Sequence, residues 1–135
     1  MRKRFGTALL AMGAALIFGG STAVSFLNRV DLRPGSEVLV NGASGAVGSA
    51  AVQLAAQAGA RVTAVTSAGN AELVRSLGAA EVIDYARQDF AKTDARYDVI
   101  VECVGNAPFE RVRCILRPGG ALTGTPENTG GEDNA

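Results

Sequence analysis

The stretch Glu37–Ser67, EVLVNGASGAVGSAAVQLAAQAGARVTAVTS, decides the fold of this chain. It begins with a short apolar run, continues through a glycine-bearing turn into a segment of small residues, and ends in a second β-branched run. A continuous apolar run predicts a strand of a parallel sheet that is covered on both faces. The segment 46–58 has its apolar residues at helical spacing, and Gly59 is expected to end that helix.

The turn between the first run and the helix has the sequence ASGAVG, a G-x-G-x-x-G pattern with alanine in the first place. Gly45 has no side chain, so a pyrophosphate could approach the backbone, and Gly48 would let the helix pack closely on the strand. The first amides of a helix have no partner within it, and the helix dipole favours negative charge there. The pattern therefore predicts a dinucleotide cradle made of six residues: Ala43, Ser44, Gly45, Ala46, Val47 and Gly48.

The rest of the chain continues the alternation of strands and helices. Further strands are expected at residues 81–84, 97–104 and 121–124, and further helices at 71–77 and 109–116. This order predicts an α/β fold, a Rossmann-type doubly wound parallel sheet with right-handed crossovers. Five strands are legible and the usual sixth is missing, so an uncovered sheet edge could favour self-association.

Three parts are expected along the chain. Residues 1–35 form a leading helical segment, residues 36–124 form the Rossmann domain, and residues 125–135 form a tail whose composition predicts disorder.

Composition excludes several functions. The chain has 135 residues, a formal net charge of zero and no basic stripe, which argues against nucleic-acid binding. It contains no histidine, so a Ser-His-Asp triad, a Cys-His pair and a histidine-based metal site are excluded. Cys103 and Cys114 are too few for a structural zinc site and are interpreted as small apolar residues, so no metal is expected.

The first thirty residues have two interpretations. Arg2-Lys3-Arg4 followed by an uncharged run over residues 5–28 outlines a secretory signal or a membrane-associated segment. The alternative is a buried helix, which Gly19-Gly20 is expected to interrupt, with Ser21 or Thr22 capping a second helix. The residues alone leave both interpretations open.

The order of these segments resembles the medium-chain dehydrogenase/reductase superfamily, most closely its zinc-independent quinone-oxidoreductase-like branch. The resemblance covers residues 14–124 and rests on eight motifs: FGGSTAVSFL (18–27), LRPG (32–35), VLVNGASGAVG (38–48), AVQLA (51–55), LVRSLGA (73–79), VIDY (82–85), YDVI (97–100) and LRPGG (116–120). It implies that residues 14–28 are the helix that precedes the cofactor strand, which favours a cytoplasmic protein. It also implies that a GroES-like substrate domain and the last strand are absent, so that the chain is a fragment.

The end of the second strand bears on the choice of cofactor. NAD-binding sites usually place Asp or Glu there to bind the ribose 2′-hydroxyl, whereas Ser67 would not repel a 2′-phosphate. NADP(H) is therefore favoured over NAD(H), with Asn70 included in the site. In similar proteins a basic residue often follows this strand end, but Ala68 and Gly69 stand here. The nearest arginine, Arg75, is expected on a solvated helix face.

The resemblance implies four further cofactor contacts, each with a structural alternative. Thr22 would lie near the nicotinamide half or cap a helix. Tyr85 would lie beside the adenosine or be a partly buried packing residue. Val104 and Gly105 would approach the ribose on the nicotinamide side, or Gly105 could be a turn glycine. Glu102 is expected to be structural, and no residue is marked as a catalytic acid.

Three functions are compatible with these residues. The leading one is the cofactor-binding domain of an NAD(P)H-dependent oxidoreductase, which transfers hydride to a quinone- or enone-type carbonyl substrate in the intact family. The second is a non-catalytic dinucleotide-binding fragment. The third is an S-adenosylmethionine methyltransferase, suggested by residues 116–120 but disfavoured because those enzymes need an acidic residue where Ser67 stands.

Overall fold

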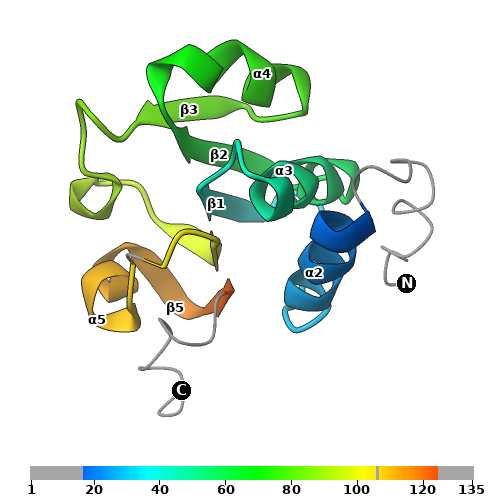
Figure 1. Cartoon of the computed structure of the whole chain (residues 1–135). Coiled ribbons are helices and arrows are strands. Elements are labelled where there is room, and N and C mark those ends of the chain that lie inside the picture. The colour runs from blue at the N-terminus through cyan, green and yellow to red at the C-terminus, as the bar shows by residue number, and fades with distance from the viewer. Residues whose placement is uncertain (1–16, 106, 125–135) are drawn as a thin grey trace.

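The computed structural model describes residues 17–105 and 107–124 (Figure 1). The expectations for residues 1–16 and for the tail 125–135 lie outside the described residues. Within the described part, no helix is both long enough and apolar enough to cross a bilayer. The choice between a buried helix and a targeting segment for residues 5–28 stays a prediction.

Five strands form one parallel sheet with the order β3-β2-β1-β4-β5, which confirms the predicted Rossmann-type fold. The strands are β1 (Glu37–Asn41), β2 (Arg61–Thr66), β3 (Glu81–Asp84), β4 (Tyr97–Glu102) and β5 (Leu116–Gly124). The chain moves outward from β1 to β3 and then returns to the other side of β1. Ligands of such sheets bind where the order reverses, which is between β1 and β4.

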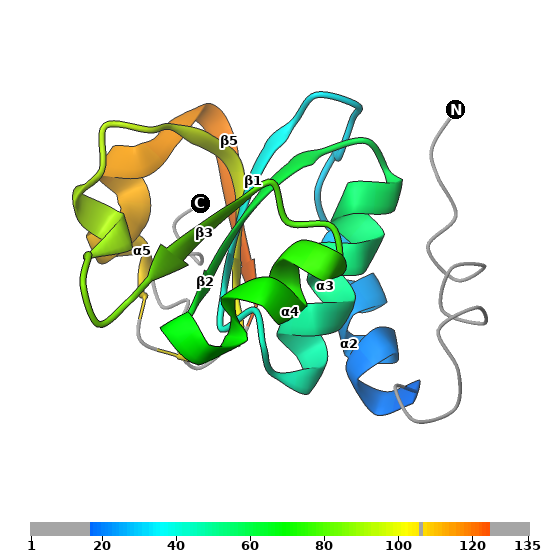
Figure 2. The same ribbon diagram turned by 90° about the horizontal axis from the view of Figure 1, so that it is seen from above.

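Helices cover both faces of the sheet (Figure 2). On one face lie α2 (Ile17–Leu27), α3 (Ala46–Gln57) and α4 (Ala71–Ser76). On the other lie α5 (Phe109–Val112) and the short turns η3 (Phe90–Lys92) and η4 (Arg113–Ile115). A further turn, η2 (Ala68–Asn70), joins β2 to α4.

Alternate residues of each strand enter two separate cores. Val38 and Val40 of β1 pack on the face of α2 and α3, whereas Leu39 faces the other side with Ile100. All four side chains are fully buried. Because both faces are covered, residues 38–40 of β1 are all apolar rather than alternating, as the sequence predicted.

One expectation about the leading helix is wrong. Gly19-Gly20 does not interrupt it: α2 continues from Ile17 to Leu27, so neither Ser21 nor Thr22 caps a second helix. Gly20 is buried, and α2 packs along α3 through Ala23 and Leu27. Tertiary packing outweighs the modest helix penalty of glycine, about 1 kcal/mol.

The fifth strand also differs from expectation. Residues 117–120 were predicted to separate the last helix from a strand starting at Ala121, but β5 begins at Leu116. Tyr97 pairs with Leu116 and Val99 with Ala121, so residues 117–120 bulge within the strand. A bulge accommodates a proline and two glycines that a regular ladder would not.

Candidate cofactor-binding site

A cavity of about 1020 Å³ lies at the carboxyl ends of β1, β2 and β4. It coincides with the point at which the strand order reverses, where open α/β sheets bind their ligands. Six of the residues predicted from sequence line it: Ser44, Gly45, Ser67, Asn70, Tyr85 and Val104. Sequence reasoning therefore named six residues of this cavity wall and missed other parts of it.

The tight turn after β1 depends on Gly42, which the motif analysis did not single out. Gly42 has a φ of +85°, and a Cβ there would lie 2.5 Å from Cγ2 of Val104. Its amide and that of Ala43 both donate to the Val65 carbonyl oxygen, at 3.2 and 3.1 Å. Ala43, in the first place of the motif, is instead fully buried and not part of the cavity wall. The dipeptide Asn41-Gly42 after a strand was the available signal.

The amino terminus of α3 opens toward the cavity at Gly45. Gly45 is the N-cap residue, and as a glycine it has no side chain to cap this end. The amide of Ser49 donates to the Gly45 carbonyl oxygen at 2.8 Å, so the amides of Ala46, Val47 and Gly48 precede that helical bond. Such amides are the groups that bind anions at helix starts.

Gly45 and Gly48 are glycines for different reasons. A Cβ on Gly48 would overlap the Gly42 carbonyl oxygen and lie 2.9 Å from Cα of Ala43, so α3 could not pack on the turn. A Cβ on Gly45 would meet nothing nearer than the Gly42 carbonyl oxygen, at 3.6 Å, and Gly45 has an ordinary φ of −75°. The chain itself does not need glycine at position 45. At Gly45, which lines the cavity, the space beside the start of the helix is left open.

Glu102 shapes the turn that follows β4. It is fully buried, its Oε1 accepts a hydrogen bond from Nδ2 of Asn41 at 2.8 Å, and its Oε2 accepts from the amide of Val104 at 2.7 Å. The amide of Gly105, which has a φ of +100°, donates to the same oxygen. Glu102 therefore has a structural role, as expected from the sequence. The turn that it holds places Val104, whose side chain is 57% exposed, at the cavity wall.

The end of β2 and the turn after β3 form the next part of the wall. Nδ2 of Asn70 donates to Oγ of Ser67 at 3.1 Å, which brings these two predicted residues together. The amide of Tyr85 donates to the Thr66 carbonyl oxygen at 3.2 Å, and the Tyr85 side chain is 63% exposed. The Tyr85 side chain is thus mainly exposed on the cavity wall, which does not support the alternative of a partly buried packing residue.

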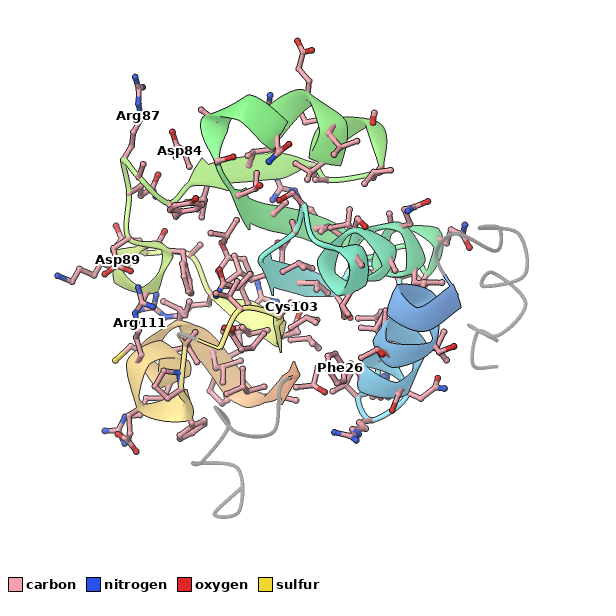
Figure 3. All side chains as sticks on the ribbon, in the orientation of Figure 1. Phe26, Asp84, Arg87, Asp89, Cys103 and Arg111 are labelled. Carbon is pink, nitrogen blue, oxygen red and sulfur yellow. The ribbon has the colours of Figure 1, made fainter. Side chains whose placement is uncertain are left out.

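The far wall comes from η3 and α5 (Figure 3). Arg111 forms an ion pair with Asp89, with 3.0 Å between Nη2 and Oδ1. The Cζ atom of its guanidinium lies 4.8 Å from the centre of the Phe90 ring. The Ala91 amide, and then Arg111, hold the pKa of the Asp89 carboxyl below its usual value. Sequence reasoning missed these residues, because they lie in an irregular segment and a short helix without a motif.

Six predicted residues lie outside the cavity wall as the structure describes it, among them the buried Ala43. Thr22 is within α2 and half-buried, and Gly105 follows the lining residue Val104. Ala46, Val47 and Gly48 reach the site only through the start of α3, since none of them lines the wall. A cofactor role for all of these residues stays a prediction.

Cys103 also lines the cavity. Burial first, and then the charge of Glu102, raise the pKa of its thiol to about 12. The thiolate is the reactive form of cysteine, so Cys103 is a poor nucleophile at neutral pH.

Among the described residues, no group of three or more His, Cys, Asp or Glu side chains is placed to hold an ion. Zinc independence stays a prediction.

A doubly wound parallel sheet with a glycine turn at its switch point defines a nucleotide-binding α/β domain. Residues 46–129 match the family model of zinc-binding dehydrogenases, and the chain belongs to this family. Its relatives place it in the quinone-oxidoreductase-like branch of the medium-chain dehydrogenase/reductase superfamily, as the sequence motifs suggested. The chain corresponds to the cofactor-binding domain of an oxidoreductase.

Three known proteins illustrate the similarity. The chloroplast envelope quinone oxidoreductase homolog of Arabidopsis thaliana is 42% identical over 109 residues, which cover 73% of this chain and 33% of that protein. The NADPH-dependent alkenal/one oxidoreductase of the same plant is 34% identical over 119 residues, covering 84% and 30%. The quinone oxidoreductase of Thermus thermophilus, solved also in complex with NADPH, has a TM-score of 0.66 at 40% identity, covering 75% and 34%. The chain thus spans about one third of the length of these proteins.

Proposed function

We propose that this chain binds a nicotinamide dinucleotide in the cavity described above, with NADP(H) preferred over NAD(H). In the whole protein, this domain would hold the cofactor for hydride transfer to a small quinone- or enone-type carbonyl compound. The similarity to an NADPH-dependent alkenal/one oxidoreductase and to a quinone oxidoreductase solved with NADPH supports both statements.

The single observation that carries the proposal is the open start of α3. The amides of residues 46–48 lie ahead of the first helical bond, and Gly45 leaves space in front of them that the fold itself does not require. A diphosphate is an anion of the size and charge that such amides bind. This accounts for a glycine that packing and backbone geometry do not explain.

The other parts of the wall have distinct proposed roles. Ser67 and Asn70 would contact the ribose of the adenosine half, and Tyr85, exposed at the cavity, would lie beside the adenine. Val104 and Gly105, held by Glu102, would lie near the ribose on the nicotinamide side. When bound, the nicotinamide supplies the hydride, while the residues of this chain bind and orient it.

Fluorescence titration of the full chain with NADPH, NADH and S-adenosylmethionine tests the proposal. We expect the two nicotinamide dinucleotides to bind and S-adenosylmethionine not to bind. Gly45→Ala should keep the thermal midpoint of the parent and weaken dinucleotide binding by about tenfold or more, since the added methyl occupies the phosphate space. Oxidation of NADPH in the presence of a quinone tests turnover separately.

Gly69→Ala is the matched control. Gly69 has open space around its Cβ position, does not line the cavity and has no positive φ, so this variant should bind as the parent does. Equal affinity of Gly45→Ala and the parent for NADPH and NADH would contradict the placement of the diphosphate at α3.

A further inference from the structure

A cofactor with a ribose 2′-phosphate brings two negative charges near the end of β2, yet the residues that follow β2 supply no cation. Positions 68–70 are Ala, Gly and Asn. Arg75, the first arginine after β2, is on α4 and does not line the cavity. The preference for NADP(H) in the proposed function, on which this inference rests, therefore needs a cation from another element.

The turn after β3 supplies one. Arg87 lines the same cavity as Ser67 and Asn70, although it is separated from Ser67 by a helix and a strand. Asp84, the last residue of β3, pairs with Thr66 in the sheet, and the Tyr85 amide donates to the Thr66 carbonyl oxygen at 3.2 Å. The turn therefore begins directly beside the position at which the 2′-phosphate is expected.

Asp84 holds this turn in a folded shape. Its carbonyl oxygen accepts hydrogen bonds from the amides of Arg87 and Gln88, both at 3.0 Å, and its Oδ1 accepts from the Ala86 amide, also at 3.0 Å. A turn closed in this way keeps its first and fourth Cα atoms within about 7 Å, and neighbouring strands lie about 4.8 Å apart. The long side chain of Arg87 can span that separation and reach a phosphate bound at Ser67.

The charge balance of the wall also singles out Arg87. The other arginine of the wall, Arg111, is paired with Asp89 at 3.0 Å and lies over Phe90. Arg87 instead has a side chain that is 87% exposed, and its nearest carboxylate contact, Nε to Oδ2 of Asp84, is long at 3.9 Å. Figure 3 shows it projecting from the turn beside Asp84. A guanidinium held this loosely can turn to a new partner at little cost.

We propose that Arg87 is the residue that confers preference for NADP(H), by pairing with the ribose 2′-phosphate while the Ser67 hydroxyl hydrogen-bonds to the same group. Guanidinium and phosphate match in charge and in donor and acceptor geometry. The cation that similar proteins take from the segment after β2 would thus come from the turn after β3.

The test compares the parent chain with Arg87→Gln, Arg87→Lys and the matched control Arg75→Gln, which removes the same charge from an exposed site outside the cavity. Each is titrated with NADPH, NADH, 2′,5′-ADP and 5′-AMP. For Arg87→Gln we expect NADPH and 2′,5′-ADP to bind about tenfold more weakly, with NADH and 5′-AMP unchanged. Arg87→Lys should retain part of the preference, and Arg75→Gln should behave as the parent.

The outcomes separate this inference from the proposed function. If the parent binds neither NADPH nor NADH, the proposed function fails and this inference fails with it. If both bind and the ratio of their affinities changes less than about twofold in Arg87→Gln, only the role of Arg87 is overturned. An equal loss in Arg75→Gln would also overturn it, because the effect would then be one of overall charge.

Discussion

At the ends of β1 and β4, tertiary contacts rather than a sequence motif explain why particular residue types are present. Gly42 takes the positive φ and leaves room for Val104, and Gly45 leaves space for a ligand. Glu102 is a buried carboxylate whose two oxygens are occupied by Asn41 and by main-chain amides. A buried carboxylate with such partners organises a turn, and removing it would leave the donors unsatisfied.

The two cysteines should differ in reactivity. Burial raises the pKa of Cys103 to about 12, whereas Cys114 is exposed. At about pH 8 an alkylating reagent should modify Cys114 first, with Cys103 reacting roughly a hundredfold more slowly in the folded chain. Mass spectrometry of partly alkylated protein measures this, and equal rates would contradict the burial of Cys103.

The same shift has a consequence for stability. The folded state favours the neutral thiol, so this contribution is fully present below pH 9.0, the ordinary pKa, and is lost as the pH rises toward about 12. The free energy of unfolding in urea should therefore fall with pH in this window, and it should fall less in Cys103→Ala.

At the scale of elements, the close contact of α3 with the turn after β1 decides how the cavity is built. The sequence predicted the bounds of α3 to within one residue and those of β3 correctly. The sequence wrongly predicted a break in α2, where packing on α3 outweighs the low helix propensity of glycine. It also placed the start of β5 too late, because a bulge opposite β4 lets the strand begin earlier.

Gly48→Ala tests the contact between α3 and the turn. The added Cβ would lie 2.8 Å from the Gly42 carbonyl carbon and 2.9 Å from Cα of Ala43, both of them backbone atoms that cannot move away freely. We expect a loss of about 1–3 kcal/mol in the free energy of unfolding, measured in urea. Gly45→Ala makes the same change three residues earlier without a close contact, and equal stability of the two variants would contradict this account.

At the scale of the whole molecule, β3 and β5 are the edges of the sheet within the described residues. β3 is short, but β5 spans nine residues. An uncovered strand of that length offers unpaired main-chain groups to another chain, and a sixth strand would normally follow at this side. Self-association through this edge stays a prediction of the fold.

Sedimentation velocity of the full chain at increasing concentration tests that prediction. We expect the average mass to rise with concentration, because pairing at the edge of β5 satisfies main-chain donors and acceptors. A single monomeric species over the whole range would show that the edge is protected.

The sequence by itself determined the α/β class, the strand–helix–strand unit, the family and the position of the cavity. The class, the strand–helix–strand unit and the position of the cavity follow from local patterns: apolar runs, helical spacing and a glycine turn within a few residues of one another. The family follows from the resemblance carried by the eight longer motifs. Only the tertiary structure decided what the wall of the cavity contains. Asn41 and Glu102 are 61 residues apart in the chain, and Arg87 reaches the cavity from a turn beyond the next strand. Their neighbours are set by the pairing of strands rather than by sequence spacing, so no local pattern could have placed them together.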